Sequence, residues 1–228
     1  MRNTTTYHIQ EEERHMETTH RIEELKSRAA TYILLAHLFK QEVTQQLVEQ
    51  MDGHGLFALL EENGYEIKSE KKLKDRDYID KLSIEFSRIF IGPGPHIPPY
   101  GSVHHPDDPK SGRLWGDTTV WVRIFIKDHG LKFEGKGYDG IPDHISGEFE
   151  FFSLLINKEI EARESGDTKK TERLLNSQRI FLTQQLSKWV PLFCNKVQEK
   201  SELSFYKEIA RFTSDLLETE KERLPAEG

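Results

Sequence analysis

One stretch of this sequence, residues 92–113, interrupts an otherwise helical pattern. It holds six of the chain's nine prolines and four of its fifteen glycines. Proline lacks a backbone donor and glycine weakens the interior of an element, so neither a helix nor an interior strand can continue through it. A loop of this length is uncommon in a compact domain unless it has a role. The residues alone leave two interpretations open: a functional loop packed on the body, or a plain connector stiffened by proline.

Helical patterns lie on both sides of this loop. Apolar residues recur at three- and four-residue steps, and breakers such as Asp52-Gly53 and Asn63-Gly64 separate the segments. The run 120–126 also fits a strand, but a lone strand is not stable, so we predict a helix there. The predicted helices span residues 21–39, 43–51, 56–62, 75–90, 117–128, 142–165, 168–189, 191–200 and 203–223.

These elements predict an all-α protein, a single compact multi-helix bundle with a long Pro/Gly-rich loop. Residues 1–20 have almost no apolar support, and we expect a flexible N-terminal tail there. Residues 21–228 then form one helical domain. A glycine-rich link over 130–140 separates the helix after the loop from an apolar, central helix.

Composition and charge narrow the classes of function. The net charge of −7, from 32 basic and 39 acidic residues, argues against nucleic-acid binding and favours a basic peptide as a partner. The single cysteine, Cys194, sits among apolar residues and is expected to be a buried, inert thiol. No apolar stretch suits a signal peptide or a bilayer span, so we expect a cytoplasmic protein without direct membrane insertion.

The most chemical-looking group opens the central helix, where Asp143, His144, Glu148 and Glu150 cluster. His144 and Glu148 are four residues apart and share a helix face, and Asp143 can cap the free N–H groups of that helix. The group is therefore either a structural cap with an ion pair or a ligand-facing cluster. If His144 faces a cationic ligand, its protonation should weaken binding below about pH 6.5.

Two other readings of the loop have little support. Its glycines lack the preceding strand and the Gly-Lys-Ser/Thr run of a phosphate-binding loop. The polar residues of the loop show no ligand spacing for zinc, so we expect them to be solvated: His96, His104, His105, Asp107 and Asp108.

Two separated motifs, IEFSRIFIGPGPHIPPYGS and PDHISGEFEFF, resemble the TorD/DmsD family of redox-enzyme maturation chaperones. That family has a Glu-led helix ending in Phe-x-Gly-Pro, a Pro-Pro-Tyr-x-Ser loop, and Pro-Asp-His before an acidic and aromatic run. Gly101 departs from the pattern, because many relatives carry an acidic residue there. The pattern falls on Glu85, Phe90, Gly92, Pro93, Pro98, Pro99, Tyr100, Ser102, Pro142, Asp143, His144, Glu148, Phe149, Glu150 and Phe151.

The resemblance implies a TorD-like, all-helical cytoplasmic chaperone without enzymatic turnover and without a cofactor of its own. Its partners would be the catalytic subunit of a molybdopterin oxidoreductase and the twin-arginine signal peptide of that subunit. The chaperone would hold back export until the molybdenum cofactor is inserted. The resemblance also implies weak guanine nucleotide binding and either a monomer or a homodimer. The peptide-binding residues would be Asp143, His144, Glu148, Glu150, Tyr100, Ser102, Pro98, Pro99, Gly92, Pro93, Phe90 and Glu85.

The alternative from another class is a helical metal-dependent hydrolase. Asp143, His144 and Glu148 would be its metal ligands, since a catalytic metal needs about three protein ligands and an open position. No serine or cysteine has a visible activating base, so nothing outside this cluster points to catalysis.

Overall fold

The computed structural model describes residues 3–53, 55–67, 75–131 and 140–224. Within these ranges it contains helices and no β-strand, as predicted. None of these helices combines the length and the apolar character that a membrane-spanning segment needs. The elements are α1 (Asn3–Lys40), α2 (Gln45–Gly53), α3 (Leu56–Glu62), α5 (Arg76–Phe86), the π-helical turn η1 (Ser87–Ile91), α6 (Gly101–His104), α7 (Asp117–Asp128), α8 (Ile145–Glu164), α9 (Thr168–Phe181), the π-helical turn η3 (Leu182–Leu186), α10 (Ser187–Lys200) and α11 (Ser204–Arg223).

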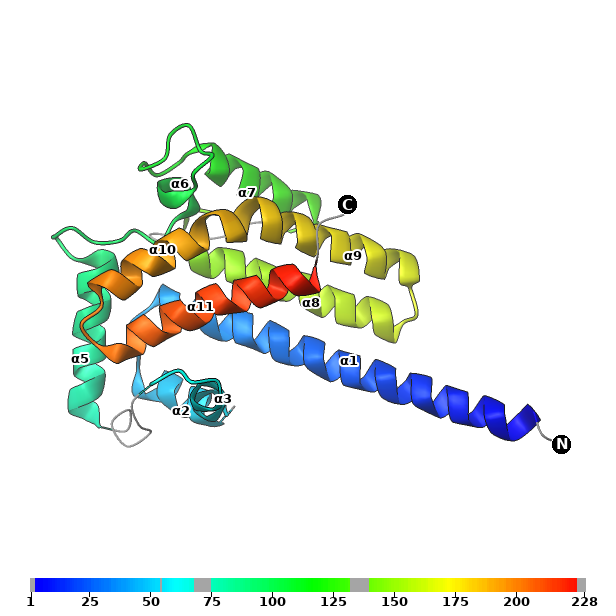
Figure 1. Cartoon of the computed structure of the whole chain (residues 1–228). Helices are drawn as coiled ribbons and strands as arrows, with labels where there is room; N and C mark the ends of the chain where they lie inside the picture. Colours follow the sequence, from blue (N-terminus) through cyan, green and yellow to red (C-terminus); the bar gives the residue numbers. More distant parts are fainter. Residues whose placement is uncertain (1–2, 54, 68–74, 132–139, 225–228) are drawn as a thin grey trace.

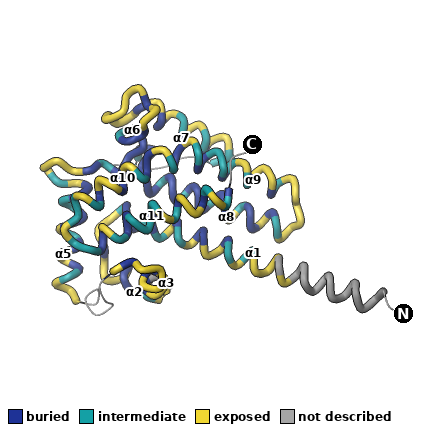
Figure 2. Tube along the Cα trace, in the orientation of Figure 1, coloured by how far each residue is buried: buried dark blue, intermediate teal, exposed yellow. Residues whose placement is uncertain are grey.

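The bundle is organised around α1 and α8, which lie side by side through the middle of the molecule (Figure 1). α9 folds back on α8, and α10 and α11 pack against each other. α2 and α3 lie below α1 in the view of Figure 1, and α7 lies at the opposite side of the bundle. The buried residues therefore follow the inner faces of these helices (Figure 2).

Aromatic side chains fill the centre of the bundle. Tyr32 of α1 contacts Phe149 and Phe152 of α8 with edge-to-face rings. Phe39 of α1 contacts Phe90 and Phe193 in the same way, with ring centroids 6.1 and 5.6 Å apart. Because such pairs add to the free energy gained from burial, they join α1 firmly to the segment that enters the loop. Cys194 lies fully buried beside them, as predicted, and burial raises the pKa of its thiol to about 12.

Several helix boundaries differ from the predicted ones. α1 already begins at Asn3, so residues 3–20, expected to be a tail, continue a helix. The boundary predicted at Pro191 is wrong, because α9, η3 and α10 follow one another without a break and Pro191 lies inside α10. The predicted loop 92–113 is not extended throughout, since residues 101–104 form α6. Most of the glycine-rich link lies outside the described residues.

Candidate functional site

The two sequence motifs meet in the structure, although about forty residues separate them. Tyr100 and His144 form an isolated antiparallel bridge, in which Gly101 N donates to Asp143 O at 2.8 Å and Ile145 N donates to Pro99 O at 2.9 Å. The rings of Tyr100 and His144 stand edge to face, with centroids 5.0 Å apart. The Pro-Pro-Tyr loop is therefore fixed to the start of α8 by its own backbone.

Asp143 caps a different helix from the one predicted. Its Oδ2 accepts a hydrogen bond from the backbone N–H of Ser102 at 2.6 Å, in the first turn of α6. The N-cap of α8 is His144, whose Nδ1 accepts from the N–H of Ser146 at 3.2 Å. The prediction that Asp143 caps the central helix is thus wrong, because the bridge turns its carboxylate toward the loop. Burial lowers the pKa of His144 to about 4, and the nearby charge of Lys40 acts in the same direction.

Glu148 lies at the bottom of the same junction. Its Oε1 accepts from Gln185 Nε2 at 2.7 Å, and its Oε2 accepts from Trp189 Nε1 at 3.0 Å. Burial, and then the charge of Asp143, raise the pKa of the Glu148 carboxyl well above its usual range. Asp143 Oδ1 and Ser102 Oγ are also buried, and neither has a hydrogen-bond partner among the described residues. The junction therefore concentrates buried polar groups between the loop, α8 and α10.

The position of Gly101 explains its departure from the family pattern. A Cβ there would lie 2.8 Å from Gln185 Nε2 and 3.3 Å from Glu148 Oε1. A contact below 3.0 Å forces a neighbour to move, so a side chain at this position would displace the amide end of Gln185, which holds Glu148.

The first motif has a structural role at its N-terminal end. Glu85 is buried, and its Oε1 accepts from the backbone N–H groups of Glu202 and Leu203 at 2.6 and 3.1 Å, where α11 begins. It also pairs with Arg88 at 3.0 Å. Phe90 lies in the aromatic core, and the N–H of Gly92 closes the π-helical turn.

Burial divides the twelve candidate residues into two sets. Asp143, His144 and Glu148 are 0, 2 and 0% exposed, and a peptide on the surface of this structure does not reach them. Eight candidates are buried in all: Asp143, His144, Glu148, Tyr100, Ser102, Pro99, Phe90 and Glu85. The other four are exposed or half-buried, and we call them the motif surface: Gly92, Pro93, Pro98 and Glu150.

Glu150 carries the charge of the motif surface. Its carboxylate pairs with Lys40 at 3.2 Å, and both side chains remain partly exposed, at 43 and 35%. Such a pair in water contributes little to stability, so the carboxylate can exchange Lys40 for another cation at small cost.

The polar loop residues are more structural than the sequence suggested. His104, His105 and Asp108 are buried, which corrects the expectation that they are solvated, whereas His96 and Asp107 are exposed. His104 Nε2 contacts Pro98 O at 2.8 Å, and its ring stacks on Trp189. Burial lowers the pKa of His104 to about 4, with Lys196 acting in the same direction.

Asp108 caps α7 from a distance in the chain. Its Oδ2 accepts from the N–H of Thr118 at 2.9 Å, so α7 is capped from ten residues upstream of Thr118. The predicted caps, Asp117 or Thr118, do not have this role.

The three ligands of the hydrolase alternative point to separate partners: Asp143 to Ser102, His144 to Ser146, and Glu148 to Gln185 and Trp189. In the part of the chain that the structure describes, no three His, Cys, Asp or Glu side chains are grouped so as to hold a metal ion. The geometry thus gives this alternative no support.

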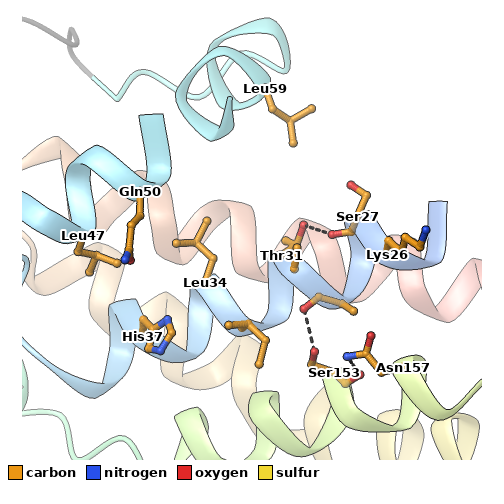
Figure 3. Close-up of a pocket in the computed structure, with 13 residues that line it drawn as sticks. Lys26, Ser27, Thr31, Leu34, His37, Leu47, Gln50, Leu59, Ser153 and Asn157 are labelled. Atoms are coloured by element: carbon orange, nitrogen blue, oxygen red, sulfur yellow. Dashed lines mark hydrogen bonds between the residues drawn. The ribbon is translucent and has the colours of Figure 1, made fainter. Parts of the chain in front are cut away.

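A groove that the sequence did not reveal lies beside the motif surface, between α1, α2, α3 and α8 (Figure 3). Its volume is about 660 Å³, a size ordinary for ligand sites. We call it the α1/α2 groove, and it is lined by Leu34, His37, Leu47, Gln50, Leu59 and Asn157, among others. Its stripe on α1 has the spacing of a core-facing helix surface, so periodicity alone cannot distinguish it from core.

The sequence of this chain is similar to known proteins. The model of one protein family, nitrate reductase delta subunit, matches residues 60–195. Chaperone protein TorD of Photobacterium profundum is 25% identical over 193 residues, which cover 79% of this chain and 86% of that protein. Chaperone protein TorD of Vibrio cholerae strain O395 is 24% identical over 208 residues, 86% of this chain and 91% of that protein.

A solved structure also resembles this chain. A redox enzyme maturation protein from Archaeoglobus fulgidus superposes with a TM-score of 0.52 at 22% identity, over 84% of this chain and 93% of that one. At this identity the likeness concerns the fold alone, and it agrees with the all-helical architecture described above.

Proposed function

Because the chain belongs to the nitrate reductase delta subunit family, we propose that it is a cytoplasmic assembly chaperone for a molybdenum-cofactor oxidoreductase. In this proposal it binds the twin-arginine signal peptide and the apo form of the catalytic subunit. Export is delayed until the cofactor has been inserted. The chaperone names of the curated relatives support this direction, and they support binding rather than turnover.

The observation that carries the proposal is the junction of the two motifs. The bridge between Tyr100 and His144 fixes a proline-stiffened loop to the start of α8, whose second turn carries the partly exposed Glu150. A carboxylate can make charge-assisted, bidentate hydrogen bonds to an arginine side chain. The motif surface therefore offers a rigid edge and an anionic partner to a basic peptide. The net charge of −7 acts in the same direction over longer distances.

The buried candidates have a supporting role in this proposal. Asp143, Tyr100 and Ser102 fix the loop, and His144 fixes the start of α8. They position Pro98 and Glu150 for the peptide instead of touching it. Weak guanine nucleotide binding and the choice between monomer and homodimer rest on the resemblance alone.

Titration with a labelled twin-arginine peptide tests the proposal. The matched control peptide has glutamine in place of both arginines and is otherwise identical. We expect saturable binding of the arginine peptide, with affinity at least about tenfold higher than that of the control, because two charge-assisted contacts are lost. Equal affinity for both peptides, or no binding of either, would overturn it. Stoichiometric metal in the purified protein, lost on Asp143→Asn, would instead favour the hydrolase.

A further inference from the structure

We propose that the α1/α2 groove binds an apolar helical segment that carries basic residues. This inference rests on the proposed function, since such a segment is the apolar run that follows the arginine pair of the client's signal peptide. The groove is built mainly from α1 and α2, which lie outside residues 60–195 that match the family model.

The lining of the groove is apolar where a peptide side chain would enter. Leu59 of α3 and Ile33 of α1 are large apolar residues at its edge, 43 and 37% exposed. Figure 3 shows Leu59 projecting toward α1 across the opening. One of the polar atoms of the lining, Ser153 Oγ, already donates to Ala29 O at 2.9 Å. The groove can therefore bury apolar side chains without removing this hydroxyl from its partner.

The charge of the chain segment beside the groove indicates what kind of peptide fits. Residues 41–67, which supply α2 and α3, contain no lysine or arginine. They contain six acidic residues, namely Glu42, Glu49, Asp52, Glu61, Glu62 and Glu66. None of the six is among the residues that line the groove, and the formally charged lining residue is Lys26, at the end away from His37. Over longer distances the acidic segment beside the groove attracts a cationic peptide and repels an anionic one. A second copy of this chain, with its own charge of −7, is a poor occupant for the same reason.

The groove is long enough for a short helical segment, and its His37 end lies close to the ion pair between Lys40 and Glu150. From Lys26 to His37 the lining of α1 extends eleven residues, or about 16 Å at 1.5 Å per residue. A helical segment of about eleven residues covers this length, in the manner of amphipathic helices bound in grooves. One turn beyond His37, Lys40 pairs with Glu150. A peptide whose arginines contact Glu150 thus runs directly into the groove with its apolar part.

The test uses the full chain and a labelled peptide with two arginines followed by about twelve alternating leucines and alanines. The groove variants are Ile33→Ser and Leu59→Ser. Ile124→Ser is the matched control, because Ile124 is an exposed isoleucine on α7, across the bundle from α2 and α3 (Figure 1). All three side chains are exposed, so the variants should keep the thermal stability of the wild type, which circular dichroism checks.

We expect each groove variant to bind the peptide about five- to tenfold more weakly and the control variant to bind like wild type. Equal binding by wild type, groove variants and control would show that the α1/α2 groove does not bind the peptide, while leaving the proposed function in place. If wild type binds neither this peptide nor its glutamine counterpart, the proposed function fails as well. Dimerisation that disappears in the groove variants would identify a second copy as the occupant and contradict the inference.

Discussion

The carboxylate of Asp143 accepts a hydrogen bond from the backbone N–H of Ser102, with 2.6 Å between Oδ2 and N. This contact caps α6 from another part of the chain. Asp143→Ala should lower the free energy of unfolding by about 1–3 kcal/mol, because a buried donor loses its acceptor. Asp143→Asn should cost less, since its amide oxygen still accepts. Denaturant unfolding measures both, and equal stability of the alanine variant and wild type would show that the contact is unimportant.

Asp143→Ala and Asp143→Asn also distinguish two roles of Asp143, which either holds the loop in place or contacts the peptide. If Asp143 only holds the loop, peptide affinity should fall in step with stability, and Asp143→Asn should bind nearly like wild type. A tenfold loss of affinity in a fully stable Asp143→Asn protein would mean that the carboxylate meets the peptide after a rearrangement.

Glu148 should make the folded state less stable as pH rises. Burial and Asp143 raise its pKa in the folded protein, so the native state holds a proton that the unfolded chain releases above its ordinary value of 4.5. As pH rises from 5 to 8, the free energy of unfolding should therefore fall less in Glu148→Gln than in wild type. The difference should be at least about 1 kcal/mol. Unfolding curves at several pH values measure the difference. Parallel profiles would contradict the assignment of a protonated carboxyl at this site.

His144, in contrast to Glu148, should make the folded state less stable as pH falls. Burial lowers its pKa from 6.5 to about 4, so below pH 6.5 the unfolded chain binds a proton that the folded protein excludes. Its contribution to stability is complete above pH 6.5 and is lost as pH falls toward 4. His144→Asn keeps a good N-cap residue and should reduce this acid loss by on the order of 1–3 kcal/mol.

The control for His144 is His96→Asn, because His96 is exposed on the loop. That variant should keep the wild-type acid profile. The lowered pKa also corrects the expectation from sequence that peptide binding changes near pH 6.5, since His144 stays neutral there. A binding transition at pH 6.5 that disappears in His144→Asn would contradict the burial of this ring.

Gly116 tests the cap of α7. A Cβ at Gly116 would overlap Asp108 Oδ2, the atom that accepts from Thr118. Gly116→Ala should displace this carboxylate and cost about 1–2 kcal/mol, the usual effect of a lost cap. Gly53→Ala is the control, because its Cβ would meet nothing within 4 Å. Equal melting temperatures for the two variants would show that Asp108 is free to move.

The helices were predictable because each carries its own periodic signal. Ile79, Leu82 and Phe86 of α5 are apolar at helical spacing, and all three are buried. The start of α1 was missed because residues 3–20 have few apolar side chains, so their sequence contains no such period. Proline lacks a backbone donor, which predicts a helix start at Pro191, yet α10 continues through it. The resemblance to the TorD/DmsD family was confirmed by the family model and the relatives.

The sequence predicted which residues belong to the candidate site, but not their contacts or their burial. Sequence placed Tyr100 and His144 in one site through family resemblance, and in the structure the two residues form a backbone bridge. Glu148, in the same site, is held by contacts with Gln185 and Trp189, far along the chain, which no local pattern reveals. For the same reason Asp143 was assigned to the wrong helix.

Above all, we propose that the surface where the two motifs meet binds a twin-arginine peptide. Hydrogen exchange of the chain, with and without saturating peptide, tests it most directly. We expect slower exchange at the non-proline amides of residues 92–98 and at residues 147–150, with no change in α7. Slower exchange confined to α7 or to α11, or no change at a peptide concentration that saturates binding, would contradict it.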